Sequence, residues 1–311
     1  MKKYISFLLL LIISFTLTGC TKKSELENYS TNLSTYNITL ELDDINKTVQ
    51  AKSSIDYYNS SEDILTEVYF HLYPNAFREN ATASVVSLSN VKKAYPNGKS
   101  YGNIQINKCK VQNNVIEYTV GGEDQNILIT PLGFQLYPKN RATIEIEFTV
   151  QIPNINHRFG YGENTINLGN FYPIACVYEN GQFATDLYHY NGDPFYSDMA
   201  NYNVTIQYNK NLILATTGTI IETKENENTK ITKANAITVR DFALVFSEKF
   251  KTIERKIGKT NVLYYYYNDQ SPNQSIKAAC DSIATFNNLF GEYPYETFSV
   301  VESNFVHGGM E

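Results

Sequence analysis

The sequence holds one pattern that could carry nucleophilic chemistry. Gly98-Lys99-Ser100-Tyr101-Gly102 matches the Gly-x-Ser-x-Gly pattern of serine hydrolases. In those enzymes the serine follows a strand and opens a helix, because this sharp turn exposes its hydroxyl. Here a Tyr-Pro-Asn-Gly turn comes before the pattern and an apparent strand, 104–106, comes after it. The context favours the tip of a hairpin, so a serine hydrolase is the weakest of our functional hypotheses.

Metal-binding chemistry is also poorly supported. The chain has four histidines: His71, His157, His189 and His307. No His-Glu-x-x-His motif occurs, and no two histidines are four residues apart, the spacing that turns two imidazoles toward one metal. Asp186, Asp193 and Asp198 surround His189, but their spacing fits no ligand template, and Asn-Gly-Asp-Pro at 191–194 is typical of a surface turn. We expect His71 to be structural, and we predict no metal site within this chain.

The first residues predict export. Lys2 and Lys3 precede an apolar run, 4–16, and Leu17-Thr18-Gly19-Cys20 follows it. A basic start, a short apolar run and small residues at a cleavage site are typical of a secretory signal. The run is shorter than the roughly 20 apolar residues that a membrane span needs. The Leu-Thr-Gly-Cys ending resembles the lipobox of bacterial lipoproteins, which implies a signal peptide at 1–19, lipid attachment at Cys20, and a protein exported and anchored to the outer face of a bacterial membrane.

After the signal, the sequence changes character twice. Residues 20–34 are polar and lack an apolar period, so we predict a flexible tether. Residues 35–255 read as a mostly β domain. Its clearest strand is 143–150, where apolar and polar side chains alternate strictly. Other predicted strands are 48–58, 115–120, 204–208 and 212–216. Many short strands separated by turns predict an antiparallel β-sandwich or a saddle-like sheet.

Residues 256–311 read as a second, α/β region. A strand at 261–267 is followed by Ser271-Pro272, a typical helix start, and by apolar residues at helical spacing up to Gly291. A strand at 297–301 completes a β-α-β order. The sequence stops at Glu311 within a glycine-rich run, which predicts that this second region is truncated.

Charge and cysteine content narrow the classes of partner. The net charge is −6, and removal of Lys2 and Lys3 with the signal makes it −8. That balance disfavours nucleic acid and offers no basic patch for a membrane surface. Besides Cys20, the cysteines are Cys109, Cys176 and Cys280, with no Cys-x-x-Cys spacing. We predict buried, reduced thiols, although one disulfide stays an open alternative.

The end of the chain carries the most specific pattern. Phe290-Gly291-Glu292-Tyr293-Pro294-Tyr295 leads into a strand and then into Gly308-Gly309-Met310-Glu311. This order resembles the aminopeptidase N family of zinc metallopeptidases, and the resemblance extends over about 35–311. Its upstream parts are Glu67–Phe77, Asn170-Phe171-Tyr172-Pro173, Gly192–Asp198 and Asp241–Val245. The resemblance implies that the α/β region is the start of a thermolysin-like catalytic domain.

The family resemblance also implies roles for the last four residues. Gly308, Gly309 and Met310 would line an edge strand that pairs with the backbone of a peptide substrate, since glycine permits close approach. Glu311 would hold the α-ammonium of the substrate through a charge-assisted hydrogen bond. The family's zinc ligands, general base and oxyanion-stabilising tyrosine follow this motif and are absent here. We therefore expect zinc only in a full-length parent, and no peptidase activity from residues 1–311 alone.

Two readings remain open. The chain is either the N-terminal part of a membrane-anchored extracytoplasmic aminopeptidase, or a non-catalytic lipid-anchored surface module that binds peptide or protein. A fragment of an enzyme should leave the apolar face of Ile276 to Phe290 uncovered, because a helix must bury its apolar stripe.

Overall fold

The structure, a computed structural model, describes residues 25–82, 84–191 and 195–306. The predicted signal peptide, Cys20 and the predicted substrate edge, Gly308 to Glu311, lie outside the described residues. Within the described ranges, no helix is long and apolar enough to span a lipid bilayer.

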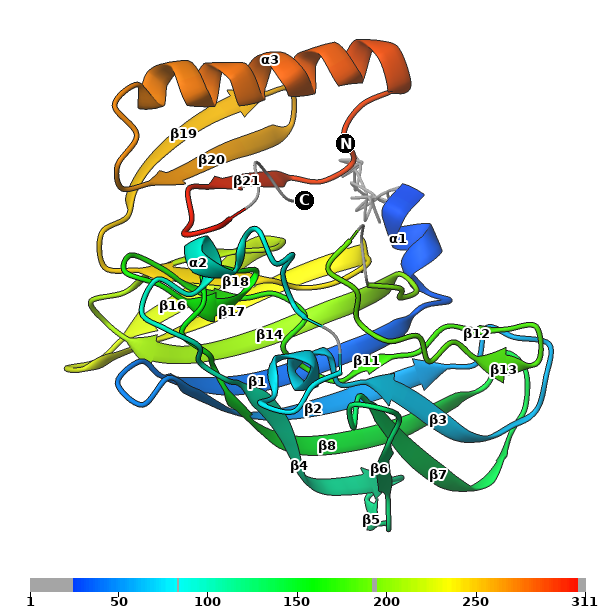
Figure 1. Cartoon of the computed structure of the whole chain (residues 1–311). Coiled ribbons are helices and arrows are strands. Elements are labelled where there is room, and N and C mark those ends of the chain that lie inside the picture. The colour runs from blue at the N-terminus through cyan, green and yellow to red at the C-terminus, as the bar shows by residue number, and fades with distance from the viewer. Residues whose placement is uncertain (1–24, 83, 192–194, 307–311) are drawn as a thin grey trace, which may run out of the picture.

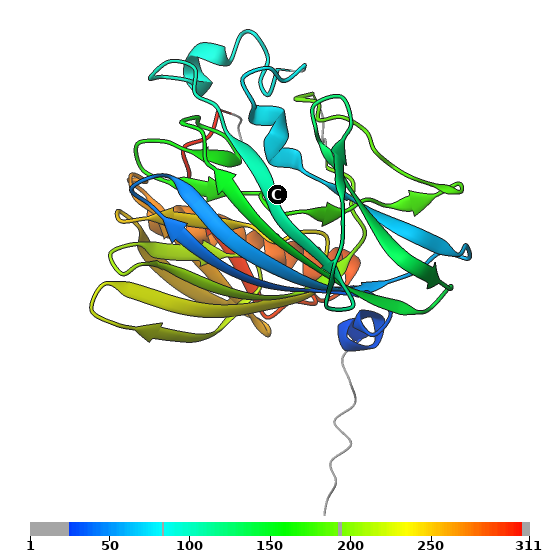
Figure 2. The ribbon, with the colours of Figure 1, turned by 90° about the horizontal axis from the view of Figure 1, so that it is seen from below.

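An eight-stranded sheet forms the body of the β domain (Figure 1). Its order is β16-β17-β14-β1-β2-β8-β4-β5. The strands are β1 (Ser34–Asp43), β2 (Thr48–Tyr58), β4 (Asn103–Val111), β5 (Asn114–Val115), β8 (Arg141–Gln151), β14 (Ala200–Asn209), β16 (Thr219–Glu225) and β17 (Thr229–Val239). Seen from below, these strands cross the molecule as one curved layer (Figure 2).

The alternation predicted for 143–150 is confirmed in β8. Ala142, Ile144, Ile146, Phe148 and Val150 are all buried, while the residues between them are partly exposed. Side chains point to opposite faces of a strand in turn, so this pattern turns one whole face of β8 into the core. β8 pairs antiparallel with β2 from Thr48↔Gln151 to Tyr58↔Arg141, which carries the same alternation into the next strand.

Smaller sheets cover the buried face. One has the order β15-β18-β10-β9 and another β11-β3-β7-β6, and a short hairpin joins β12 to β13. Their strands are β3 (Leu65–His71), β6 (Thr119–Gly121), β7 (Ile127–Leu136), β9 (Phe159–Tyr161), β10 (Ile166–Leu168), β11 (Ile174–Ala175), β12 (Tyr178–Glu179), β13 (Gln182–Phe183), β15 (Ile213–Thr216) and β18 (Leu244–Ser247). Phe70, Leu168 and Phe246, one or more from each four-stranded sheet, belong to the same core cluster as Phe148. The predicted sandwich-like packing is therefore observed.

An α/β unit lies on one side of the β domain (Figure 1). It contains β19 (Lys251–Ile257), β20 (Thr260–Tyr266), α3 (Pro272–Phe290) and β21 (Thr297–Val301), with the sheet order β19-β20-β21. Val262 and Tyr264 face α3, where they pack with Ile276, Cys280 and Ile283. On the other face, Tyr265 packs with Phe250 and Ala215 of the β domain. The predicted β-α-β order is confirmed, and its sheet lies between α3 and the β domain.

Three predictions need correction. β1 pairs with β14 in parallel, so the large sheet is not wholly antiparallel. The single strand predicted at 115–120 is two short strands, β5 and β6, in different sheets. β19, Lys251–Ile257, was not expected as a strand.

Part of the segment predicted to be a tether has regular structure. Residues 25–30 form a short helix, α1 (Glu25–Ser30), and this segment is held by side chains from distant strands. Asn201 Nδ2 donates to the Ser30 carbonyl at 2.9 Å, and Arg141 Nη2 donates to the carbonyl of Thr31 at 2.8 Å. Because these partners are more than 100 residues away in sequence, local composition could not reveal them. Two further short helices, η1 (Tyr73–Phe77) and α2 (Val91–Ala94), complete the described elements.

Candidate functional site

The best candidate site is the segment that leaves β21 toward the predicted substrate edge. β21 runs parallel to β20, from Asn261↔Thr297 to Tyr265↔Val301, and stands last in the order of its sheet. Its outer edge pairs with no other strand among the described residues. An unpaired strand edge offers backbone N–H and C=O groups to an extended peptide. The edge of β21, Thr297–Val301, therefore suits strand addition, while Gly308, Gly309, Met310 and Glu311 themselves lie outside the described residues.

The carboxylate of Glu302 fixes the first residue after β21. The backbone N–H of Glu302 donates to the Tyr265 carbonyl at 2.8 Å and so extends the pairing of β21 with β20 by one hydrogen bond. Its Oε2 accepts hydrogen bonds from the backbone N–H groups of Tyr267, Asn268 and Asp269, at 2.8, 3.0 and 3.2 Å. One carboxylate thus holds the turn between β20 and α3, so Glu302 is structural, and the end of β21 and the start of the helix segment are tied together.

The next two residues dock onto the β domain through polar contacts. Ser303 Oγ donates to Asn167 Oδ1 at 2.9 Å. The Asn304 backbone N–H donates to Thr165 Oγ1 at 3.3 Å, and Asn304 Oδ1 accepts from the Asn164 backbone N–H at 2.9 Å. These bonds bridge about 140 residues of sequence. They fix the position from which the predicted substrate edge begins, relative to the loop between β9 and β10.

Gly162 makes this close docking possible. A Cβ atom at Gly162 would lie 2.4 Å from Asn156 Oδ1 and 3.0 Å from the Asn304 side chain. An added Cβ would push the end of the Asn156 side chain aside and press on Asn304, so glycine is the residue that leaves both side chains where they are. Gly162 itself donates its backbone N–H to the Thr165 carbonyl at 3.0 Å, which closes the same loop.

Aromatic rings form the base beneath this segment. Phe305 contacts His157 edge to face, with ring centroids 6.0 Å apart, and Phe77 contacts the same imidazole at 5.2 Å. His157 is 2 % exposed, and its Nε2 lies 3.3 Å from the Tyr188 hydroxyl. Sequence analysis singled out no role for His157, because no local motif marks it. The structure gives it one: it is a buried packing partner of the segment after β21.

The other residues weighed from sequence do not assemble into a site. Ser100 lies in the loop between α2 and β4, not at a hairpin tip, and its Oγ accepts from the Asn154 backbone N–H at 2.9 Å. His189 is exposed, and no group of three or more His, Cys, Asp or Glu able to hold a metal occurs within 25–82, 84–191 and 195–306. Cys109, Cys176 and Cys280 are buried free thiols.

His71 has the structural placement expected of it. It is the last residue of β3, 2 % exposed, and its ring stacks on Tyr73 with centroids 4.7 Å apart. Burial lowers the pKa of His71 from 6.5 to about 4, against the opposing influence of the nearby Asp186 carboxylate. The imidazole is therefore neutral at physiological pH, as a buried packing residue should be.

Comparison with known proteins gives a structural likeness only. No protein-family model matches the chain, and no curated protein sequence matches it. The fold is similar to that of the M1 zinc metallopeptidase from Deinococcus radiodurans, with a TM-score of 0.52 and 11% sequence identity. A point mutant of that protein gives a TM-score of 0.53 at 11% identity, and the mutant with a bound Tyr-Ser-Ala substrate gives 0.51 at 10%. In each case the match covers 87% of this chain and 56% of the other, so the chain spans little more than half of the proteins it matches.

Proposed function

We propose that this chain is the N-terminal part of a membrane-anchored extracytoplasmic zinc aminopeptidase-like metallopeptidase. It supplies the β domain, the first α/β unit of the catalytic domain, and the edge that binds peptide substrate. The observation that carries the proposal is that the Gly-Gly-Met-Glu motif comes at the end of a chain whose fold is similar to that of an M1 metallopeptidase. The fold similar to that of the M1 metallopeptidase covers 87% of the chain, and the Gly-Gly-Met-Glu motif begins at Gly308, a short segment after β21, the last described strand, ends at Val301.

The chemistry assigned to this edge follows from its residue types. Gly308 and Gly309 allow another backbone to approach closely, and strand pairing binds a peptide without demanding a particular sequence. Glu311 then holds the α-ammonium, which selects peptides with a free N-terminus. The contacts of Glu302, Ser303 and Asn304 support the proposal, because they give this edge a fixed origin on both the α/β unit and the β domain.

Zinc does not fit the residues described here. No cluster of suitable ligands occurs in the described ranges, and the chain has no His-Glu-x-x-His motif. We therefore assign no step of a reaction to a metal held by this chain. In the proposed parent, the zinc ligands and general base belong to the portion of the M1 fold that this chain does not cover.

Anchoring is proposed from the sequence alone. Cys20 follows a basic, apolar leader and would carry the lipid, which places the β domain and its peptide edge on the outer face of a bacterial membrane. α1 begins five residues after Cys20, so the body of the protein would lie close to the membrane surface.

The test is hydrolysis by the protein purified from its native membrane. It should cleave aminoacyl p-nitroanilides, lose this activity to a zinc chelator, and spare the same substrates once they are N-acetylated. Glu311→Gln should raise KM for the free-amine substrates at least tenfold, because the ammonium loses its charged partner. Glu296→Gln, an exposed glutamate in the same unit, is the matched control and should leave KM unchanged.

A non-catalytic surface module is the second candidate. It is favoured by the completeness of the β domain, whose core cluster runs from Tyr36 to Phe246 without help from α3. In that case the native protein hydrolyses no aminoacyl anilide, with or without added zinc, yet still binds peptide. That pair of results would overturn the enzyme proposal and support the module.

A further inference from the structure

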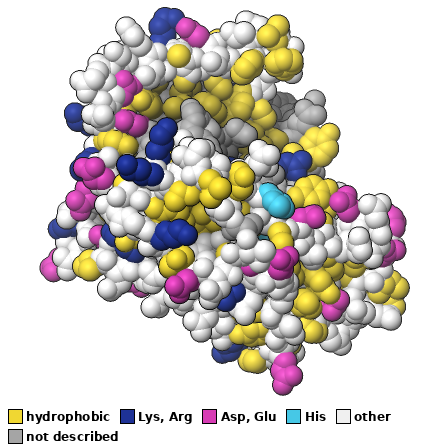
Figure 3. All heavy atoms as spheres, in the orientation of Figure 1, with side chains coloured by type: hydrophobic (Ala, Val, Ile, Leu, Met, Phe, Trp, Pro, Cys, Tyr) yellow, Lys and Arg dark blue, Asp and Glu magenta, His cyan; other side chains and the backbone are white. Residues whose placement is uncertain are grey.

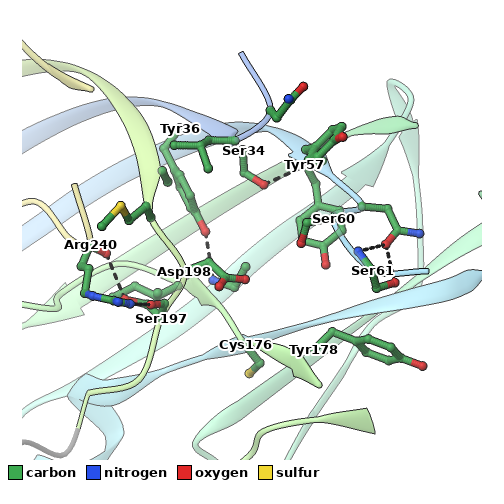
Figure 4. Close-up of a pocket in the computed structure, with 18 of the residues that line it drawn as sticks. Ser34, Tyr36, Tyr57, Ser60, Ser61, Cys176, Tyr178, Ser197, Asp198 and Arg240 are labelled. Atoms are coloured by element: carbon green, nitrogen blue, oxygen red, sulfur yellow. Dashed lines mark hydrogen bonds between the residues drawn. The ribbon is translucent and has the colours of Figure 1, made fainter. Parts of the chain in front are cut away.

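A second pocket lies in the β domain, apart from the peptide edge. It has a volume of about 340 Å³ and opens where the ends of β1, β2, β11 and β14 meet (Figure 4). Tyr36, Tyr57, Cys176, Ser197, Asp198 and Arg240 are among its lining residues. None of the residues that line it belongs to β19, β20, α3 or β21, so its occupant would not compete with a peptide on β21.

Asp198 supplies the pocket with a carboxylate that the protein does not neutralise. Within the described residues it makes no hydrogen bond and no ion pair. The nearest cation, Arg240, donates from Nη1 to the Ser197 carbonyl at 2.6 Å instead. Asp198 is exposed at the mouth of the pocket. The surrounding protein still raises the pKa of its carboxyl by desolvation, which Arg240 partly opposes and Glu179 reinforces. An unpaired carboxylate at the mouth of a pocket can accept a charge-assisted hydrogen bond from a bound ammonium.

Apart from Arg240, the residues that line the pocket around this carboxylate are uncharged, and several of them are tyrosines. Figure 4 shows Asp198 between Arg240 on one side and Tyr57 on the other, with Tyr36 beside it. Burial is the main cause that raises the pKa values of the Tyr36 and Tyr57 hydroxyls. The negative charge of the nearby Asp198 raises both pKa values further. Burial also raises the pKa of the Cys176 thiol, which is therefore uncharged. One face of the Tyr36 ring is stacked on Tyr202, with centroids 5.1 Å apart, so Tyr36 and Tyr57 give a ligand apolar ring surface to contact and no open π face is assigned to Tyr36.

We propose that this pocket binds a small organic cation, a primary ammonium carried on an apolar stem. Asp198 pairs with the ammonium, and Tyr36 and Tyr57 contact the stem. The volume is within the range of small-molecule sites, in which apolar walls and a few polar groups converge on the ligand. The Tyr36 hydroxyl accepts a hydrogen bond from the Ala175 backbone N–H at 3.0 Å, which holds its ring in place as a preformed wall.

The test uses benzylamine and benzyl alcohol, which share a shape and differ in charge. Saturation-transfer NMR on the full chain at neutral pH should show benzylamine binding at least tenfold more tightly than benzyl alcohol. Asp198→Asn should remove this preference. Glu117→Gln removes the same charge from an exposed site that does not line the pocket, and it should leave the preference intact.

Thermal unfolding of each variant shows whether it is folded. If Asp198→Asn does not fold, the proposal is tested only by comparing the affinities of benzylamine and benzyl alcohol for the unmodified protein. Equal affinity of the unmodified protein for amine and alcohol would overturn the proposal. So would a folded Asp198→Asn variant that keeps the preference for benzylamine.

Discussion

The imidazole of His71 makes the β domain sensitive to acid. In the unfolded chain a histidine has a pKa near 6.5, whereas burial lowers that of His71 to about 4 in the folded protein. Between these values the unfolded state binds more protons than the folded state. The free energy of unfolding therefore has its full value above pH 6.5 and falls as the pH drops toward 4.

This effect predicts a measurable difference between variants. At pH 5 the contribution of His71 should be a loss of about 2 kcal/mol relative to pH 7. His71→Phe keeps an aromatic ring against Tyr73 and should lose this part of the pH dependence. Urea unfolding at pH 7, 6 and 5 measures it, with His189→Phe as the exposed control. An unchanged pH dependence in His71→Phe would show that other groups cause the acid sensitivity.

Glu302 acts on the backbone and not on a substrate. Removal of its side chain in Glu302→Ala leaves three N–H groups of the turn after β20 without their acceptor. We expect the amides of Tyr267, Asn268 and Asp269 to exchange with solvent deuterium roughly 10- to 100-fold faster, which corresponds to about 1–3 kcal/mol. Hydrogen exchange followed by NMR measures this, and the exposed Glu254→Ala should leave these amides unchanged. Equal exchange in both variants would mean that water replaces the carboxylate at little cost.

The helix α3 is longer than the strands it covers. Its 19 residues extend over about 28 Å, and a seven-residue strand such as β20 over about 23 Å. For a fragment, we expected the whole apolar face from Ile276 to Phe290 to be uncovered. The structure differs in part, because Ile276, Cys280 and Ile283 are buried. Phe286, Leu289 and Phe290 are 55, 66 and 81% exposed. Figure 3 shows hydrophobic side chains gathered at this end of the helix.

The exposed end of α3 predicts self-association of the isolated chain. Phe286→Ser with Phe290→Ser should reduce the oligomers seen by sedimentation velocity and change the melting temperature by no more than a few degrees, since neither side chain is buried. Ile283→Ser, from the covered part of the same helix, should instead lower the melting temperature. If the double variant associates as strongly as the unmodified chain, the surface that mediates self-association lies elsewhere.

We expect the loop between β9 and β10 to hold the segment after β21 in place. Gly162→Ala pushes a methyl group toward Asn156 and Asn304 and should weaken the docking of Asn304. The amides of Asn164 and Asn304 should then lose protection from hydrogen exchange by at least tenfold. Gly121→Ala is the matched control, because a Cβ there meets no atom within 4 Å. Protection that survives in Gly162→Ala would show that the loop adapts without releasing Asn304.

At the scale of the whole molecule, the proposed function places peptide binding in this chain and the zinc chemistry outside it. The described residues form a β domain with its own core and hold the segment after β21, and they contain no group of metal ligands. We expect residues 1–311 alone to show no zinc-dependent hydrolysis of aminoacyl p-nitroanilides, with a rate indistinguishable from buffer. The unmodified protein from its native membrane is the positive control. Robust turnover by residues 1–311 would overturn this expectation, and with it the proposal that the zinc site lies outside this chain.

Periodic elements could be predicted because their signals are local. Strict alternation identified β8, and Ser271-Pro272 with Gly291 identified the bounds of α3. Even here the detailed capping differs, because the Ser271 side chain makes no capping bond and Asp269 accepts from both the Ser271 N–H and the Ser275 hydroxyl. β19 escaped prediction, since Ile253 and Ile257 are its only apolar residues and its other side chains are exposed.

By itself, the sequence determined the mostly β class, the β-α-β end and the order of motifs that resembles the aminopeptidase N family. Each of these rests on side-chain periodicity or on residues adjacent in the chain. Only the tertiary structure decided the parallel pairing of β1 with β14, the docking of Asn304 on Thr165, and the pocket around Asp198. These features join residues far apart in sequence, and their energy comes from burial and hydrogen bonds that exist only once the chain is folded.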